Sequence, residues 1–242
     1  MERLQKIIAK AGIASRRKAE ILIAEGHIQV DGVTITEMGF IVKKGSKVTY
    51  NGKSLMGENK VYYVLHKPKR VISTVNDEKQ RKTVLDFIDT TERIFPIGRL
   101  DYDTSGVLLL TNDGDFANEL THPRYHIDKT YEVKIDGILK TEEIKQLERG
   151  VSLDEVMTLP AKVWITNKDF AKKETEFEIT IEEGKNRQIK RMCETYGYTV
   201  LRLHRKRFAF VEVTDLKVGE YRRLKPFEVK QLRKLANEGK LK

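Results

Sequence analysis

Residues 96–115 read PIGRLDYDTSGVLLLTNDGD and place Asp101 and Asp103 shortly before an apolar run. The apolar run Val107–Leu110 predicts a strand that is buried on both faces. The residues before it predict a polar turn that brings carboxylates to the start of that strand.

A calcium-binding loop is one alternative for this stretch. Asp101, Asp103, Ser105 and Gly106 occupy positions 1, 3, 5 and 6 of such a loop, which needs a bidentate Glu at position 12. Asn112 stands there instead, and half of the loop would be an apolar strand. We therefore expect no metal at this turn.

An ordinary turn before a core strand would also explain the two carboxylates. Arg99 lies two residues before Asp101, just ahead of the edge of a strand. A carboxylate in such a place can remain ionised and open to a cleft. These residues alone do not decide between an ordinary turn and a functional carboxylate in a cleft.

Residues 61–242 otherwise alternate between short strands and turns. Residues 61–67, VYYVLHK, are aromatic and β-branched and end at Pro68, which predicts a strand. Helices are predicted over residues 114–121, 141–149 and 226–242. This mixture predicts an α+β domain around a mainly antiparallel sheet, with Trp164 in its core.

The first 53 residues predict a separate small module that begins with two helices. Residues 3–11 carry apolar side chains at the spacing of one helical face, and Gly12 ends this helix. Ser15 is in position to cap a second helix, which ends at Gly26.

A hairpin follows these two helices. HIQVDGVTIT, residues 27–36, has alternating apolar residues around Asp31-Gly32, a dipeptide that accepts the positive φ angles of a tight turn. Residues 47–53 predict another strand and turn, and residues 54–60 a short flexible linker. The predicted domains are therefore 1–53 and 61–242.

The charge indicates a polyanionic partner. Forty-six Lys and Arg against 36 Asp and Glu give a formal net charge of +10, which favours nucleic acid first and an anionic membrane second. No apolar run approaches the roughly 20 residues of a membrane span, so we expect a cytoplasmic protein.

Cysteine and histidine give no sign of a metal centre. Cys193 is the single cysteine, which excludes an intramolecular disulfide and a thiolate zinc cluster. The histidines lack metal-type spacing, and we expect them in loops or on the surface: His27, His66, His122, His126 and His204.

The N-terminal segment resembles the S4 RNA-binding domain. The resemblance is carried by KAGIASRRKAEILIAEGHIQVDG, residues 10–32, and covers about the first 53 residues. It implies that Arg16, Arg17 and Lys18 contact the phosphates of structured RNA. An S4 domain by itself implies RNA binding and says nothing about chemistry.

The remainder resembles the pseudouridine synthases of the ribosomal type. GRLDYDTSG at 98–106 is similar to their catalytic motif, and KTY at 129–131, EGKNRQIKRM at 183–192 and VLRLHRKRFAF at 200–210 follow in the family's order. The motifs and the S4 segment resemble the branch that modifies ribosomal RNA, nearest its large-subunit members. The resemblance implies a catalytic domain with a central cleft.

The resemblance also implies the roles of three residues. Asp101 would be the essential carboxylate, with Asp103 as the rival candidate. Lys190 would supply its cationic partner, since a carboxylate in a partly dry cleft needs one. Tyr131 would receive the target base, which must leave its stack before the ribose can be reached.

Other residues would hold the RNA. Arg99 is expected to contact the backbone near the flipped nucleotide, and Arg187 and Arg191 to hold phosphates or shape their loop. One departure from the family is Arg70 in HKPKRVIST, where similar proteins often carry glycine.

The expected activity is the conversion of a uridine in ribosomal RNA to pseudouridine. The C1′–N1 bond breaks, the uracil turns, and C5 is joined to C1′, so no atom is gained or lost and no cofactor is expected. Attack by Asp101 on the sugar and assisted elimination to a glycal both remain open. The alternatives are the same reaction on small-subunit RNA and a non-catalytic S4-type assembly factor, and we expect a monomer.

Overall fold

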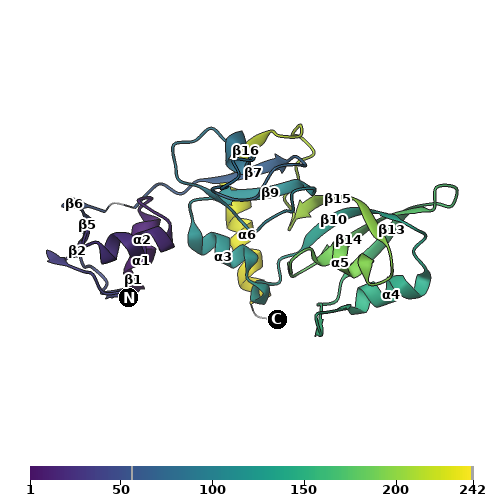
Figure 1. Ribbon diagram of the computed structural model, residues 1–242, viewed down its shortest axis with the longest axis horizontal. Coiled ribbons are helices and arrows are strands. Elements are labelled where there is room, and N and C mark those ends of the chain that lie inside the picture. Colours follow the sequence, from purple (N-terminus) through teal and green to yellow (C-terminus); the bar gives the residue numbers. More distant parts are fainter. Residues whose placement is uncertain (56, 241–242) are drawn as a thin grey trace. The chain divides into compact units, whose positions relative to one another are not determined.

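The computed structural model describes residues 1–55 and 57–240. Its contacts divide the chain into two compact units (Figure 1). The first unit is Met1–Val61 together with the short segments Thr90–Arg93 and Asn112–Gly114, and the second unit is the remainder.

The first unit consists of two helices and a small antiparallel sheet. The elements are β1 (Glu2–Arg3), α1 (Leu4–Lys10), α2 (Arg16–Ala24), β2 (Ile28–Val30), β3 (Val33–Thr34), β4 (Ile41–Val42), β5 (Val48–Tyr50) and β6 (Lys53–Ser54). The main sheet has the order β3-β2-β5-β6, and β1 pairs with β4. Its core contains Leu4 and Ile8 from α1, Ala19 and Ile23 from α2, and Ile28 from β2.

Local sequence explains the boundaries of these elements. Ser15 caps α2, because its Oγ accepts a hydrogen bond from the backbone N–H of Lys18 at 3.2 Å. Asp31 and Gly32 have φ angles of 52° and 84°, as the tight turn between β2 and β3 requires. The predicted helix–helix–hairpin order is therefore confirmed.

The second unit is built on an eight-stranded sheet. Its strands are β7 (Tyr62–Lys67), β8 (Phe95–Pro96), β9 (Ser105–Thr111), β10 (Lys129–Asp136), β13 (Lys162–Asp169), β14 (Glu174–Ile181), β15 (Thr199–Phe208) and β16 (Tyr221–Arg223). The order is β13-β14-β10-β15-β9-β7-β16, with β8 beside β9. All pairs are antiparallel except β9 with β15, so the predicted α+β fold with a mainly antiparallel sheet is confirmed.

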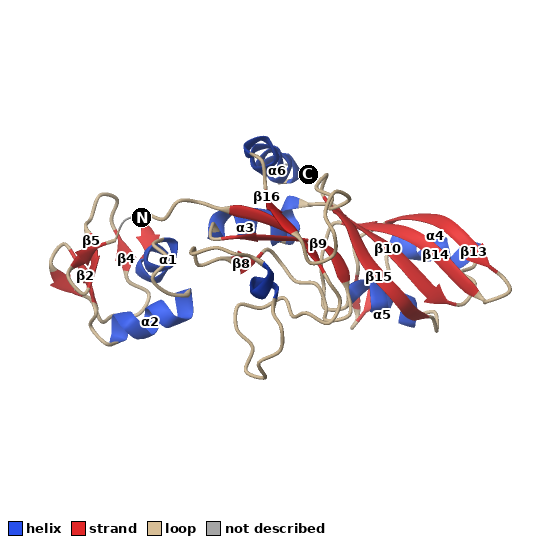
Figure 2. Cartoon of the chain, turned by 90° about the horizontal axis from the view of Figure 1, so that it is seen from above, coloured by secondary structure: helices blue, strands red, loops and turns tan. Residues whose placement is uncertain are grey.

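Helices cover the two halves of this sheet separately (Figures 1 and 2). The helices are α3 (Gly114–Thr121), α4 (Thr141–Arg149), α5 (Gln188–Glu194) and α6 (Pro226–Gly239). Short 3₁₀ turns lie at Val84–Phe87 and Pro123–Tyr125, and β11 (Ser152–Leu153) and β12 (Val156–Met157) form a small hairpin. α3 and α6 contribute Phe116 and Leu232 to one core with Val107 and Leu109 of β9. The helices predicted at 114–121 and 141–149 are confirmed.

The strands of the other half alternate between two faces. On β14, Phe177 and Ile179 are buried, while Glu176 and Glu178 are partly exposed on the opposite face. The expectation that Trp164 lies in the core is wrong, because its side chain is 74% exposed. Trp164 lies on the edge strand β13 opposite Glu178 of β14, so both side chains are on the solvent face of the sheet.

The expectation for the histidines is wrong for two of them. His66 lies within β7 and His204 within β15, both partly buried, with their ring centroids 5.5 Å apart. Burial lowers the pKa of His204 below its usual 6.5.

In the part of the chain that is described, no helix is long and apolar enough to span a bilayer.

A single glycine permits the two halves of the sheet to join. β9 and β15 are linked by only two residue pairs, His204 with Ser105 and Arg205 with Gly106. Gly106 has a φ of 114°, and a Cβ there would lie 2.2 Å from the backbone oxygen of Arg205. A side chain would therefore force β9 away from β15.

Gly106→Ala should destabilise the protein by at least about 2–3 kcal/mol, because it adds backbone strain and a backbone clash. Urea unfolding would measure the loss. Gly114→Ala is the matched control, since Gly114 has no positive φ and a Cβ there would meet nothing within 4 Å. Equal stability of the two variants would show that β9 and β15 do not need this close approach.

Candidate active site

Asp101 lies in the loop between β8 and β9, a few residues before the first residue of β9. This loop has no regular secondary structure, and other elements hold it by its backbone. The Ser73 hydroxyl donates to the carbonyl of Leu100 at 2.8 Å and accepts the N–H of the same residue at 3.1 Å. The N–H of Arg70 donates to the carbonyl of Tyr102 at 2.6 Å.

The buried side chain of Lys67 holds the same loop from below the surface. Its Nζ donates to the carbonyls of Pro68 at 3.0 Å, Asp101 at 3.1 Å and Thr104 at 2.9 Å. Burial lowers the pKa of Lys67 to about 8, although the nearby carboxylates of Asp101 and Asp103 oppose this shift. Lys67 thus positions the loop without reaching the solvent.

Lys190 brings a second ammonium group to the loop from α5. Most of this short helix is buried, including Ile189, Met192 and Lys190 itself. The Nζ of Lys190 lies 3.2 Å from Oδ2 of Asp101 and 2.5 Å from Oδ1 of Asp103. One ammonium group therefore serves two carboxylates, which the sequence did not predict.

The two carboxylates differ in their surroundings. The side chain of Asp101 is 34% exposed and that of Asp103 is 64% exposed. Partial burial tends to raise the pKa of Asp103, but the hydrogen bond and charge of Lys190 outweigh it and hold the pKa below 3.8. Asp103 is therefore an anion at neutral pH.

Tyr131 approaches from β10 with its ring held in place. Its side chain is largely buried, and its hydroxyl accepts a hydrogen bond from Nη1 of Arg205 at 3.3 Å. Arg205 is also buried, and its Nε donates to the carbonyl of Val107 in β9 at 2.7 Å. Arg205 thereby connects the ring of Tyr131 to the strand that follows the Asp101 loop.

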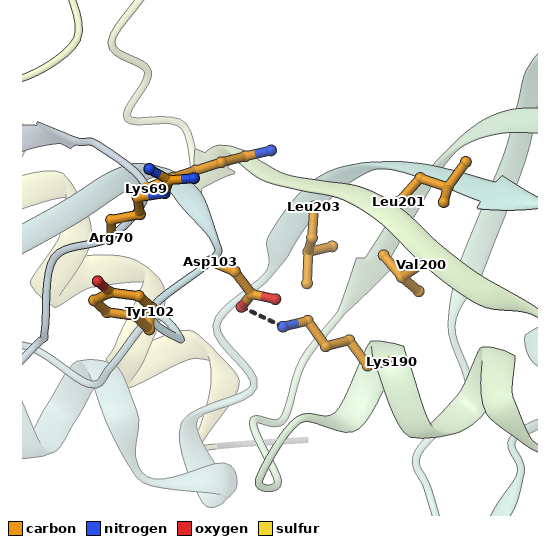
Figure 3. Close-up of a pocket in the computed structure, with 8 residues that line it drawn as sticks. All are labelled: Lys69, Arg70, Tyr102, Asp103, Lys190, Val200, Leu201 and Leu203. Carbon is orange, nitrogen blue, oxygen red and sulfur yellow. Dashed lines mark hydrogen bonds and ion pairs between the residues drawn. The ribbon is translucent and has the colours of Figure 1, made fainter.

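Two neighbouring pockets surround these groups. The Asp101 pocket is lined by Arg99, Leu100, Asp101, Thr104, Tyr131, Ile181, Gly184, Lys185, Arg187, Gln188, Ile189 and Leu203. The Asp103 pocket is lined by Lys69, Arg70, Tyr102, Asp103, Lys190, Val200, Leu201 and Leu203 (Figure 3). Leu203 lines both pockets, and Lys190 of the Asp103 pocket contacts Asp101.

The predicted RNA-binding residues take different positions. Arg99 and Arg187 are exposed at the Asp101 pocket, and Arg187 also lies 3.3 Å from Glu194. Arg191 instead pairs with Asp154 at 2.6 Å. Residues 16–18 are exposed at the start of α2, in the first unit.

A thiol nucleophile and a metal-binding cluster were also considered among the described side chains. Burial raises the pKa of Cys193 to about 12, so its thiol is not an available nucleophile at neutral pH. Among residues 1–55 and 57–240, no group of three or more His, Cys, Asp or Glu side chains is arranged to hold a metal ion.

Comparisons with known proteins show the family of this chain. Residues 61–195 match the family model described as RNA pseudouridylate synthase, and residues 2–53 match that of the S4 domain. The chain belongs to the RNA pseudouridylate synthase family and is an isomerase.

Individual relatives make the comparison more specific. The chain is 51% identical over 241 residues to ribosomal large subunit pseudouridine synthase B of Bacillus subtilis, covering 99% of both chains. It is 37% identical over 238 residues to the dual-specificity RNA pseudouridine synthase RluF of Escherichia coli, covering 96% of this chain and 79% of that one. A crystal structure of a pseudouridylate synthase matches with a TM-score of 0.70 and 28% identity, covering 96% of this chain and 100% of that one.

Lys67→Met should lower the free energy of unfolding by about 2–4 kcal/mol, because it leaves buried carbonyls of the Asp101 loop without a donor. Denaturant unfolding would measure the change. Lys69→Met is the control, since Lys69 is an exposed neighbour, and it should change stability by no more than about 0.5 kcal/mol.

The difference in stability between the wild type and Lys67→Met should depend on pH. The pKa of Lys67 is about 8 in the folded protein and 10.5 ordinarily, so the unfolded chain binds more protons between these pH values. The stability of the wild type relative to Lys67→Met should therefore rise with pH across this window and stay constant below it. A relative stability that falls across this window would contradict the assignment.

Proposed function

We propose that this protein converts a uridine of large-subunit ribosomal RNA to pseudouridine, with Asp101 as the essential carboxylate. The single observation that carries the assignment of the site is the convergence of Asp101, Lys190 and Tyr131 on one loop and the pocket beside it. These side chains come from three different elements, and each supplies a separate need of the reaction.

The reaction needs a carboxylate near the sugar. Breaking the C1′–N1 bond develops positive charge at C1′, which a carboxylate can attack or stabilise. Asp101 lies partly exposed in its pocket, and Lys190 offers a counter-charge at 3.2 Å that limits the cost of its burial.

The freed uracil must be held while it turns. Tyr131 supplies an aromatic ring at the Asp101 pocket, and Leu203 supplies an apolar surface there. An aromatic ring can stack on either face of a base that has left its helix. Arg205 keeps the ring of Tyr131 from moving away.

The pockets favour Asp101 over Asp103 as the reactive carboxylate. Asp101 and Tyr131 line the same pocket, whereas Asp103 lines the neighbouring one. Asp103 is also the more exposed of the two. In this proposal Asp103 is a second partner of Lys190 and does not act on the sugar.

The target RNA is inferred from the relatives and the first unit. The relative that is 51% identical over nearly the whole chain is named for the large ribosomal subunit. The exposed basic start of α2, Arg16, Arg17 and Lys18, supports a contact of the S4 segment with RNA phosphates. We infer a monomer, because one chain carries every residue of the proposed site.

Asp101→Asn should lower tritium release from 5-tritiated uridine in large-subunit RNA by on the order of 10³-fold or more, because the amide cannot replace the carboxylate. Asp103→Asn is the matched control, since both carboxylates contact Lys190. This second variant should lose no more than about tenfold.

Both variants should bind the same RNA as the wild type, which would exclude a general loss of folding. Undiminished turnover by Asp101→Asn would overturn the assignment. The reverse order of effects, with Asp103→Asn inactive, would make Asp103 the reactive carboxylate.

Deletion of the gene should remove a pseudouridine from large-subunit ribosomal RNA and none from small-subunit RNA. Mapping pseudouridines in both RNAs with and without the gene would measure this. Restoration by the wild-type gene and not by Asp101→Asn would tie the loss to the chemistry. A missing pseudouridine in small-subunit RNA would instead move the proposed target there.

A further inference from the structure

We propose that the Asp103 pocket is a binding site for the nucleotide next to the target uridine, and that Arg70 binds a phosphate there. The inference rests on the proposed function, since it concerns the RNA strand that enters the Asp101 pocket. It adds a second nucleotide site and assigns a role to Arg70.

The backbone of Arg70 is held in an unfavourable conformation at the pocket. Its φ angle is 62°, in the left-handed region where glycine is favoured over residues with a Cβ. Its N–H donates to the carbonyl of Tyr102, so the turn is fixed against the Asp101 loop. A long charged side chain in this conformation costs folding free energy, which is typical of functional sites.

The charges of the pocket leave two cations without an acidic partner. Lys190 is shared by Asp101 and Asp103, so its charge is compensated. The side chains of Lys69 and Arg70 are exposed, and neither has an acidic partner within the described residues. Figure 3 shows both on the same side of Asp103. Adjacent unpaired cations, one a guanidinium, suit a phosphate group.

The other surfaces of the pocket suit a base. Tyr102 is 48% exposed, and Val200 and Leu201 line the side of the pocket across from it (Figure 3). The pocket has a volume of about 280 Å³. Cations that face a phosphate beside an exposed aromatic ring are typical of sites for single-stranded nucleic acid.

The two pockets share a boundary, which fits two consecutive nucleotides of one strand. Leu203 lines both pockets, and Lys190 reaches from the Asp103 pocket to Asp101. A strand that places its target sugar at Asp101 therefore has its neighbouring nucleotide within reach of Tyr102 and Arg70.

Arg70→Gly is the variant that tests the phosphate contact, because glycine accepts the φ angle while the charge is removed. On a large-subunit RNA transcript it should lower kcat/KM about tenfold, the effect of losing one charge-assisted contact. The slope of log kcat/KM against log salt should become shallower by about 0.7, as expected for one phosphate of a single strand. Its melting temperature should equal or exceed that of the wild type.

Lys173→Gly is the matched control for this variant. Lys173 is also an exposed basic residue with a positive φ, 55°, but it lies in the turn between β13 and β14 and lines neither pocket. Its removal should leave kcat/KM and the salt slope unchanged. Arg70→Gly behaving like Lys173→Gly in both measurements would overturn the proposal.

Tyr102→Leu tests the base contact separately. It should lower kcat/KM about tenfold without changing the salt slope, and Tyr102→Phe should not, because stacking needs the ring and not the hydroxyl. Equal activity of Tyr102→Leu and wild type would remove the base from the proposal.

Binding of the same transcript separates this proposal from the proposed function. If the wild type binds the transcript but releases no tritium, the proposed function fails. The role of the Asp103 pocket is then tested by comparing the dissociation constants of Arg70→Gly and the wild type for this transcript. A weaker affinity and a shallower salt slope for Arg70→Gly would then support the phosphate contact. A weaker affinity with an unchanged slope would contradict it.

Discussion

The buried ammonium of Lys67 is the constraint on which the shape of the site depends. The loop that carries Asp101 forms no ladder with a strand and no helix, so its backbone carbonyls need other donors. Lys67 supplies a donor to two of them, at Asp101 and Thr104, and the hydroxyl of Ser73 and the N–H of Arg70 supply others. A charged group that is costly to bury is thus retained because it replaces secondary structure in a short segment.

The remaining groups reach this loop because of the sheet topology. β15 lies between β10 and β9, so Arg205 can hold both Tyr131 and the backbone of β9. α5 lies against β15 with its apolar side chains buried, and Lys190 reaches the loop from this helix. The carboxylates, the ammonium group and the aromatic ring therefore come from separate segments, and only the tertiary fold places them together.

The sequence predicted the local features well and the long-range ones in part. Alternating apolar residues, Ser15 and Asp31-Gly32 predicted elements of the first unit, because capping and turn chemistry act within a few residues. The prediction that Trp164 lies in the core was wrong, because the pairing of β13 with β14 sets which face of this edge strand is exposed, and the local sequence does not show that pairing. The roles of Lys67 and Arg205 were missed for a similar reason. A lysine at the end of a mostly apolar strand before Pro68 was the one available signal, and it does not say which carbonyls the side chain will meet.

The narrow junction at Gly106 has a mechanical consequence. Asp101 belongs to the half of the sheet with β9 and β7, while Lys190 and Tyr131 belong to the half with β10 and β15. Two residue pairs join the strands across this seam, the Nε of Arg205 donates across it to the carbonyl of Val107, and Lys190 pairs across it with Asp101 and Asp103. Asp101 therefore lies across a narrow junction from Lys190 and Tyr131, and the alignment of this junction sets their separation. A small shift between the two halves would change the distances from Asp101 to Lys190 and Tyr131.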